Sequence, residues 1–325
     1  MSSLLSVKNM SINFDTPRGS LEAVRGVDIE IPAGTSVGVV GESGSGKTVM
    51  CRAAMGLLQG SNVKRSGTVI FDGHELTAMS KEEVRNLFGS GMAMIFQDPM
   101  TALNPVRRIG SQLSEGLRVR LGMSKADALV RSKELLELVR IPNAAAILKS
   151  FPYQLSGGMR QRVMIAIAIA CNPKLLFADE PTTALDVTVQ AQILQLLREL
   201  REDLKMSMVL VTHDLGVVAG NTDYVAVMYA GEIVEYAPTT KLFADMRMPY
   251  TEALLDSIPK IDHKLGTRLA MIAGRLPDPT DRGAGCSFAP RCKYAQEKCH
   301  KEHPELKKDP DGHLYRCWFP IGVAK

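Results

Sequence analysis

Apolar and polar positions follow two different periods along the chain. Val27, Ile29 and Ile31 alternate with polar residues, which predicts a half-buried strand. Short apolar runs typical of buried strands occur at Val37–Val40, Met92–Phe96, Leu175–Ala178 and Met208–Val211. Between the last two runs, apolar residues recur at helical spacing from Val189 to Leu204. This alternation of strands and helices over about 240 residues predicts an α/β fold with a largely parallel sheet.

A helical stretch interrupts this pattern. Ser80 to Glu83 forms a capping box that predicts a short helix, and Ser124 to Asp127 caps a second one. From Pro105 to Ser150 we find no convincing strand. We therefore expect a helical subdomain at about residues 105–165, inserted into a domain that spans residues 1–248.

The tail differs in composition from the rest of the chain. Beyond Pro249 it is rich in Pro, Gly, Lys and Cys, and Pro277–Gly285 reads as a loop or linker. We expect residues 249–325 to form a small cysteine-rich C-terminal domain. Because such a segment is too short for a hydrophobic core of its own, a cross-linking ion or cluster would stabilise it.

Composition limits the possible functions. The chain has 325 residues, 45% of them hydrophobic and 23% charged, and a net charge of +4, which is not the clustered basic surface of a nucleic-acid binder. Its longest apolar run, Val163–Cys171, is much shorter than the ~20 residues that span a bilayer. The N-terminal residues lack the basic and apolar regions of a signal peptide. We expect any work at a membrane to be done from its surface.

The segment 41–48 carries the clearest chemistry. Its sequence, GESGSGKT, matches the phosphate-binding pattern G-x-x-x-x-G-K-[ST]. Glycines allow backbone N–H groups to surround a polyphosphate, a lysine contacts the outer phosphates, and a threonine hydroxyl binds Mg²⁺. A chance Gly/Ser loop is the alternative, but the segment follows a predicted buried strand and precedes a helix. The residues expected to bind ATP here are Gly41, Ser43, Gly44, Ser45, Gly46, Lys47 and Thr48.

Two acidic residues end the apolar run that begins at Leu175. Asp179 suits Mg²⁺, and Glu180 could accept a proton from attacking water. Taken alone, the pair is better explained as two solvated acids at the end of a strand, but together with the phosphate-binding loop it favours the catalytic interpretation.

The segment Leu155–Met159 has the sequence LSGGM, and here the chain resembles the ABC ATPases, whose signature is L-S-G-G-x. The other motifs of that family occur in the same order: Gln97 matches the Q-loop, Asp186 the D-loop and His213 the switch histidine. Each alone has a simpler explanation: the LSGG segment could be a plain helix N-cap with glycines, Gln97 a surface amide and His213 a strand-end histidine. We identify Phe14 as a candidate for stacking on adenine.

The resemblance implies an active site shared by two ATPase domains packed head to tail. The residues implied to act on the ATP of this chain are Lys47, Thr48, Gln97, Asp179, Glu180 and His213. Of these, Glu180, His213 and Gln97 are the expected catalytic residues, and Thr48, Gln97 and Asp179 the expected Mg²⁺ ligands. Ser156, Gly157 and Gly158, with Asp186, would complete the site of the partner.

Two longer runs, Met94–Pro105 and Ala178–Val187, and the tail after Pro249 resemble the dipeptide/oligopeptide importer ATPases. Met248 departs from that family, which usually has histidine before Pro-Tyr-Thr. The resemblance implies two membrane permeases, a second homologous ATPase and an extracytoplasmic binding protein as partners, no nucleic acid, and a peripheral location on the cytoplasmic face of the bacterial inner membrane. Because some relatives import nickel, opines or oligosaccharides, these substrates remain alternatives to a peptide cargo. A non-transport ABC ATPase that acts on nucleic acid or ribosomes, or a zinc-binding module that senses ATP, are the alternatives from other classes.

Four of the six cysteines lie in the tail, as Cys286-x₅-Cys292-x₆-Cys299-x₁₇-Cys317. Neither the close pairs of structural zinc sites nor the common ferredoxin spacings occur here. A cluster, a Zn²⁺ ion and unligated thiols therefore remain open, and the resemblance to the dipeptide-importer ATPases implies a [4Fe–4S] cluster. We expect Cys51 and Cys171 to be small core residues within helices. We expect His300, His303 and His313 to lie on the surface.

Overall fold

The computed structural model describes residues 3–183, 185–258 and 272–322. These form two compact units. The first comprises the described parts of residues 1–32, 36–78 and 210–325, and the second comprises those of 33–35 and 79–209. Strand β8 (Ser207–Thr212) is divided between them.

The first unit contains an antiparallel sheet with the strand order β2-β1-β4-β5. Its strands are β1 (Ser3–Thr16), β2 (Gly19–Pro32), β4 (Val63–Phe71) and β5 (His74–Glu75). In β2, Val27, Ile29 and Ile31 are buried between exposed acids, as predicted. The sequence pattern did not predict the sheet itself. The pairing of β1 with β2 shifts register several times between Ser3 and Asn13, and each shift breaks the period-two alternation that would reveal a strand.

The other strands of the first unit follow the order β11-β12-β10-β9-β3. They are β3 (Ser36–Val40), β9 (Tyr224–Tyr229), β10 (Glu232–Pro238), β11 (Lys307–Lys308) and β12 (Leu314–Tyr315). The pair β3–β9 is parallel, and the pairs from β9 to β11 are antiparallel. All five residues of β3 are buried, which confirms the predicted central strand. The tail supplies β11 and β12, and with them the antiparallel pairs β10–β12 and β11–β12.

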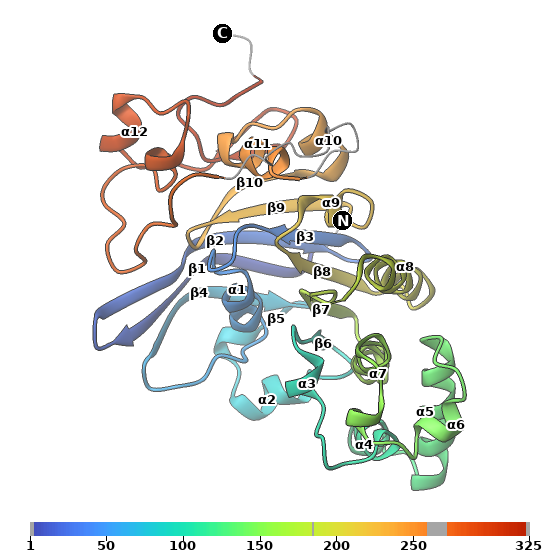
Figure 1. Ribbon diagram of the computed structural model, residues 1–325. Coiled ribbons are helices and arrows are strands. Elements are labelled where there is room, and N and C mark those ends of the chain that lie inside the picture. Colours follow the sequence, from blue (N-terminus) through green and yellow to red (C-terminus); the bar gives the residue numbers. More distant parts are fainter. Residues whose placement is uncertain (1–2, 184, 259–271, 323–325) are drawn as a thin grey trace. The chain divides into compact units, whose positions relative to one another are not determined.

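Among its described residues, this unit also contains seven short helical elements. They are α1 (Lys47–Ala54), η1 (Leu76–Ala78), α9 (Leu215–Ala219), α10 (Thr239–Ala244), α11 (Pro249–Asp256), η3 (Ala289–Arg291) and α12 (Glu297–Lys301). In Figure 1 the tail with α12, in red, lies on the same side as α11. The rings of Tyr229, Tyr250 and Phe288 pack together with centroids 4.5 to 5.3 Å apart. This aromatic cluster joins β9, α11 and the tail into one core.

The second unit combines a parallel strand pair with a group of helices. The strands are β6 (Met92–Ile95) and β7 (Leu175–Asp179), and β6 is one residue shorter than predicted. The helices are α2 (Lys81–Asn86), α3 (Pro99–Ala102), α4 (Ile109–Leu121), α5 (Lys125–Leu138), α6 (Ala144–Ile147), η2 (Pro152–Gln154), α7 (Gly157–Ile169) and α8 (Val187–Asp203). Ser80 caps α2 through a capping box and Ser124 caps α5, as predicted. Between α3 and α7 the described residues contain no strand, in agreement with the predicted helical insertion (Figure 1).

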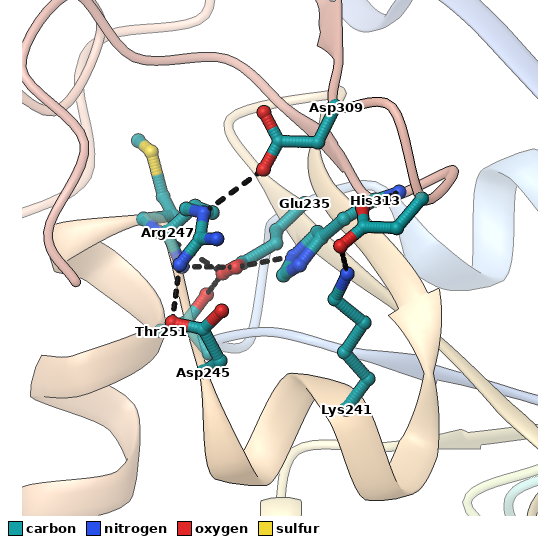
Figure 2. A network of polar contacts seen from close by, with 9 residues as sticks. Glu235, Lys241, Asp245, Arg247, Thr251, Asp309 and His313 are labelled. Atoms are coloured by element: carbon teal, nitrogen blue, oxygen red, sulfur yellow. Dashed lines mark hydrogen bonds and ion pairs between the residues drawn. The ribbon is translucent and has the colours of Figure 1, made fainter. Parts of the chain in front are cut away.

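A buried polar network fixes the tail to β10 and α11 (Figure 2). Glu235 and His313 are both fully buried, and Nε2 of His313 hydrogen-bonds to Oε1 of Glu235 at 2.8 Å. The backbone N–H of Arg247 donates to the same carboxyl group at 2.5 Å, and the hydroxyl of Thr251 also donates to it. The prediction that His313 lies on the surface is therefore wrong, because its ring is needed to satisfy a buried carboxyl group.

His303 also differs from the prediction. Its Nε2 lies 2.9 Å from Oε1 of Glu232, a buried residue at the start of β10, and its ring is only partly exposed. His300 is exposed, as expected. Sequence alone did not reveal the two buried carboxyl groups that these histidines contact.

The two remaining cysteines are buried, as predicted. Cys51 lies within α1. Cys171 lies just beyond α7, which ends at Ile169, so its placement within a helix was wrong. No helix among the described residues is both long and apolar enough to cross a bilayer.

Candidate functional site

The phosphate-binding loop of the first unit connects β3 to α1. Gly44 and Gly46 adopt positive φ angles of 83° and 100°, which L side chains disfavour. A Cβ atom on Gly46 would lie 2.5 Å from the carbonyl oxygen of Ala23. The loop therefore needs glycine here for its turn and for its close approach to the neighbouring strand, as the motif predicted.

Lys47 begins α1 and is almost completely buried, with 4% of its surface exposed. Its Nζ atom donates to the carbonyl oxygens of Gly41 and Glu42, at 2.8 and 2.9 Å. These contacts hold the ammonium group within the curve of the loop, where a phosphate would be received. Thr48 follows in the first turn of the same helix.

Two further predicted residues belong to the first unit. His213 is exposed directly after β8 and precedes Asp214, which caps α9. Phe14 lies half-buried on β1, paired with Leu21 and Val63 on the neighbouring strands. Their roles at the nucleotide stay predictions.

In the second unit, Gln97 and Glu180 meet at one edge of the strand pair. Ile95 of β6 is in register with Ala178 of β7, so the residues that follow these parallel strands emerge side by side. Nε2 of Gln97 donates to Oε2 of Glu180 at 2.9 Å, and the hydroxyl of Thr183 donates to the same oxygen at 2.9 Å. These contacts fix the direction of the Glu180 carboxylate.

Glu180 also has an unusual backbone, with φ at 44°. A left-handed glutamate is strained, and such strain occurs often at functional sites. Asp179, one residue earlier, is fully buried at the end of β7. Both acids were predicted from the sequence, but Thr183 was not, because it stood only within a longer matching run.

The LSGGM segment opens helix α7. Ser156 is its N-cap, and the hydroxyl of Ser156 accepts a hydrogen bond from the N–H of Met159 at 3.3 Å. The helix begins at Gly157, so both glycines belong to its first turn. Asp186 caps α8 in the same way, accepting from Val189 at 2.9 Å.

The glycines of this segment lie close to α8. A Cβ atom on Gly158 would lie 3.0 Å from Cγ1 of Val189, whereas one on Gly157 would have ordinary contact at 3.6 Å with Leu185. The structure thus brings the signature segment and Asp186 together within the second unit. Their action on a partner's ATP stays a prediction.

The four tail cysteines of the first unit line one cavity. Around it lie Met248, Pro249, Cys286, Phe288, Ala289, Cys292, Tyr294, Cys299, Cys317, Trp318 and Phe319. The backbone N–H of Cys286 donates to the carbonyl oxygen of Cys299 at 2.7 Å, which joins the first and third cysteines. All six cysteines of the chain are described, and none forms a disulfide. Among the described residues, no group of three or more His, Cys, Asp or Glu side chains is arranged to hold a metal ion.

The cavity is apolar and disfavours isolated thiolates. Burial raises the pKa of Cys286 and Cys292, and it raises that of Cys317 to about 12. The neighbouring thiols add to the effect at Cys317. Because thiolate is the form that binds metal, a bound group would have to supply the stabilising positive charge.

The phosphate-binding loop also contacts the tail, which sequence analysis missed. Arg291, next to Cys292, pairs with Glu42 of the loop, and the hydroxyl of Tyr250 accepts from the N–H of Glu42. The only sequence signal was the Pro249-Tyr250-Thr251 run, read as a mark of family alone.

Comparison with protein families gives two matches. Residues 24–183 match the family described as "ABC transporter", and residues 234–299 match "Oligopeptide/dipeptide transporter, C-terminal region". The second match covers most of β10, all of α11 and the first three tail cysteines.

Similar proteins extend over the full chain. An oligopeptide transport ATP-binding protein of Bacillus subtilis, AppD, is 47% identical over 98% of this chain and 97% of its own length. The dipeptide transport ATP-binding protein DppD of Escherichia coli is 46% identical over 99% and 98%. Among solved structures, the dimeric ATP-binding cassette MJ0796 bound to ADP and phosphate has a TM-score of 0.65 and 27% identity, over 72% of this chain and 98% of that one. The ABC ATPase fold predicted from the sequence is therefore confirmed, and the chain belongs to the oligopeptide and dipeptide transport ATP-binding proteins of the ABC transporters.

Proposed function

We propose that this ABC ATPase hydrolyses ATP to power the import of dipeptides or oligopeptides. The observation that carries the proposal is the Gln97–Glu180–Thr183 arrangement, an oriented carboxylate in a chain that also has a well-formed phosphate-binding loop. The peptide cargo is supported by full-length likeness to relatives named for oligopeptide and dipeptide transport.

We assign a role to each type of group in the motifs. Lys47 and the N–H groups of the loop bind the outer phosphates of ATP. Glu180 orients the attacking water and accepts its proton, while Gln97 and Thr183 hold the carboxylate in place. His213 is the proposed second contact to the γ-phosphate.

Magnesium suits the oxygen donors available. Thr48 in the first turn of α1 and the buried Asp179 offer a hydroxyl and a carboxylate, and Gln97 an amide oxygen. When bound with ATP, the ion would neutralise charge that develops on the phosphates.

The proposed assembly contains more than this chain. Ser156 and the glycine turn of α7 form a second helix N-terminus that would complete the ATP site of a homologous ATPase. The similar cassette MJ0796 is a dimer, which supports this pairing. Two membrane permeases and an extracytoplasmic binding protein complete the proposed importer, with this chain at the cytoplasmic face of the membrane.

We propose a [4Fe–4S] cluster as the group that fills the cysteine cavity of the C-terminal tail. Four cysteines from separate turns face one apolar space, as a cluster requires. The spacing of these cysteines along the sequence lacks the close pairs that structural zinc sites prefer, which favours a cluster over zinc. Its role would be to cross-link the tail.

Glu180→Gln tests the catalytic assignment. We expect the variant to bind ATP with unchanged affinity and to lose turnover by about 100-fold or more, as for the loss of a general base. Lys47→Ala is the comparison, since it should weaken ATP binding itself. Hydrolysis near the wild-type rate in the Glu180→Gln variant would refute the role of this carboxylate.

Transport itself tests the cargo. We expect membrane vesicles with the complete importer to accumulate a labelled dipeptide when ATP is supplied, and to stop when this subunit carries Glu180→Gln. Accumulation of Ni²⁺ but not of peptides, or failure of the chain to co-purify with membrane proteins, would exclude peptide import.

The cluster is tested by an oxygen-free preparation. We expect a brown protein with iron and sulfide in equal amounts, and loss of both in Cys292→Ser. Cys171→Ser is the matched control, because this buried cysteine lies in the other unit. A colourless, iron-free wild-type protein would refute the cluster.

A further inference from the structure

The C-terminal segment reaches the phosphate-binding loop through a buried arginine. The two terminal nitrogens of Arg291 donate to the two carboxylate oxygens of Glu42, at 2.7 and 2.9 Å. Only 5% of the arginine side chain is exposed. A bidentate pair with this degree of burial is directional and weakly screened by salt.

Other contacts hold Arg291 itself in position. Its Nε donates to the carbonyl oxygen of Ala273 at 2.9 Å, and Nη2 donates to that of Ile272 at 3.1 Å. Its guanidinium group also lies over the ring of Tyr229, 5.9 Å from the centroid. These contacts within the first unit hold the arginine in place independently of its pair with Glu42.

A second contact reaches the backbone of the same loop residue. The hydroxyl of Tyr250, fully buried in α11, accepts a hydrogen bond from the N–H of Glu42 at 2.9 Å. Leu276 of the tail lies beside Gly44, 3.5 Å from where a Cβ atom would stand. Three separate parts of the C-terminal segment therefore contact the loop.

Charge gives these contacts a consequence for ATP. Glu42 puts a carboxylate into a loop that must receive a polyanion, and an unpaired carboxylate there would repel the phosphates. The Arg291 guanidinium compensates that charge and also prevents the side chain from turning toward the bound nucleotide.

We propose that Arg291 and Tyr250 are positioning residues for ATP, which set nucleotide affinity by holding Glu42 of the phosphate-binding loop. Neither is a catalytic residue. The inference rests on ATP binding at this loop, and it places the control of that affinity in the C-terminal segment.

The test measures the ATP dissociation constant and the steady-state kinetics of the full chain. We expect Arg291→Gln to raise Kd and KM about tenfold, by the Coulomb repulsion of the unpaired Glu42, while kcat changes little. In a Glu42→Gln background the same Arg291→Gln change should alter Kd by less than about threefold. Arg291→Lys, which keeps the charge, should fall between wild type and Arg291→Gln. Tyr250→Phe removes only the hydroxyl and keeps the aromatic core, so it should raise Kd by a smaller factor.

Lys293→Gln is the matched control. Lys293 stands on the other side of Cys292 and pairs with Glu252 of α11 instead of Glu42, so its loss should leave Kd unchanged. Equal weakening by Arg291→Gln in both backgrounds, or no weakening at all, would overturn the inference. If Lys47→Ala weakens ATP binding while Arg291→Gln does not, only this inference fails and the ATP site stands. Thermal unfolding of each variant identifies those that fail to fold.

Discussion

Gly44 and Gly46 have similar backbone angles but different surroundings. Both lie in the left-handed region, where an L side chain costs about 1–2 kcal/mol. The space at Gly44 is open except for Leu276 at 3.5 Å, whereas at Gly46 the backbone oxygen of Ala23 is 2.5 Å from a Cβ position. A backbone atom cannot move aside as a flexible side chain can, so Gly46 is the more restricted of the two.

We predict that Gly46→Ala destabilises the protein clearly more than Gly44→Ala. Gly44→Ala should cost only the ~1–2 kcal/mol of the backbone conformation, and Gly46→Ala that cost plus the clash. Chemical denaturation of the two variants measures the difference. Equal losses would show that the loop can move away from Ala23.

The sequence predicted the roles of most residues whose partners are close neighbours in the chain. The caps Ser80, Ser124 and Ser156 were identified because a cap hydroxyl and the N–H that donates to it are only three residues apart. His313 was misplaced because its partner Glu235 lies 78 residues away, and no local pattern marks such a pair. The Arg291–Glu42 pair, 249 residues apart, escaped prediction for the same reason.

At the scale of elements, β10 depends on the tail for the hydrogen-bond partners of its buried acids. Its two buried acids, Glu232 and Glu235, find partners in His303 and His313, which the tail supplies. A strand that buries carboxyl groups is unfavourable unless each one is hydrogen-bonded. The tail is therefore required for the stability of a strand that precedes it.

We predict that His313→Ala lowers the free energy of unfolding by about 1–3 kcal/mol, because it leaves the Glu235 carboxyl group with one partner fewer in a buried site. His300→Ala, at an exposed histidine of the same tail, should change stability little. Thermal unfolding of both variants measures this. Similar midpoints for the two would contradict the importance of the network.

Glu232 gives a prediction for acid stability. Burial favours its neutral form, but the hydrogen bond and charge of His303, with Arg316 and Arg25, outweigh burial and hold its pKa below the ordinary value. A lowered pKa in the folded state adds stability that is present above the unfolded pKa of about 4.3 and is lost as the pH falls through the folded pKa. We predict that His303→Gln raises the pH of acid unfolding, and an unchanged acid transition would argue against the pairing.

At the scale of the whole molecule, the motifs divide between the two units. The phosphate-binding loop and His213 belong to the first, and Gln97, Glu180 and the signature segment to the second. Sequence predicted this set because ABC motifs are local in the chain. It did not predict the antiparallel sheet, since the register shifts in β1 hide its alternation. Nor did it predict that the tail enters the core of the first unit through Phe288.

We predict that a chain ending at residue 258 is strongly destabilised. It lacks Phe288, which packs against Tyr229 and Tyr250, and both histidine partners of the β10 acids. Loss of a buried Phe side chain alone costs about 3–5 kcal/mol. Limited proteolysis and thermal unfolding beside the full chain measure the effect. A shortened chain of equal stability would show that the tail is an independent module.

The contact between residues 42 and 291 constrains how this chain can be recombined. A tail transplanted from a relative brings its own residue at position 291 but leaves Glu42 behind in the recipient. A hybrid with a neutral residue there would carry an uncompensated acid beside its nucleotide, even if every ATPase motif were intact. Exchange of tails between such proteins should therefore give a hybrid that binds ATP normally only when residues 42 and 291 are exchanged together.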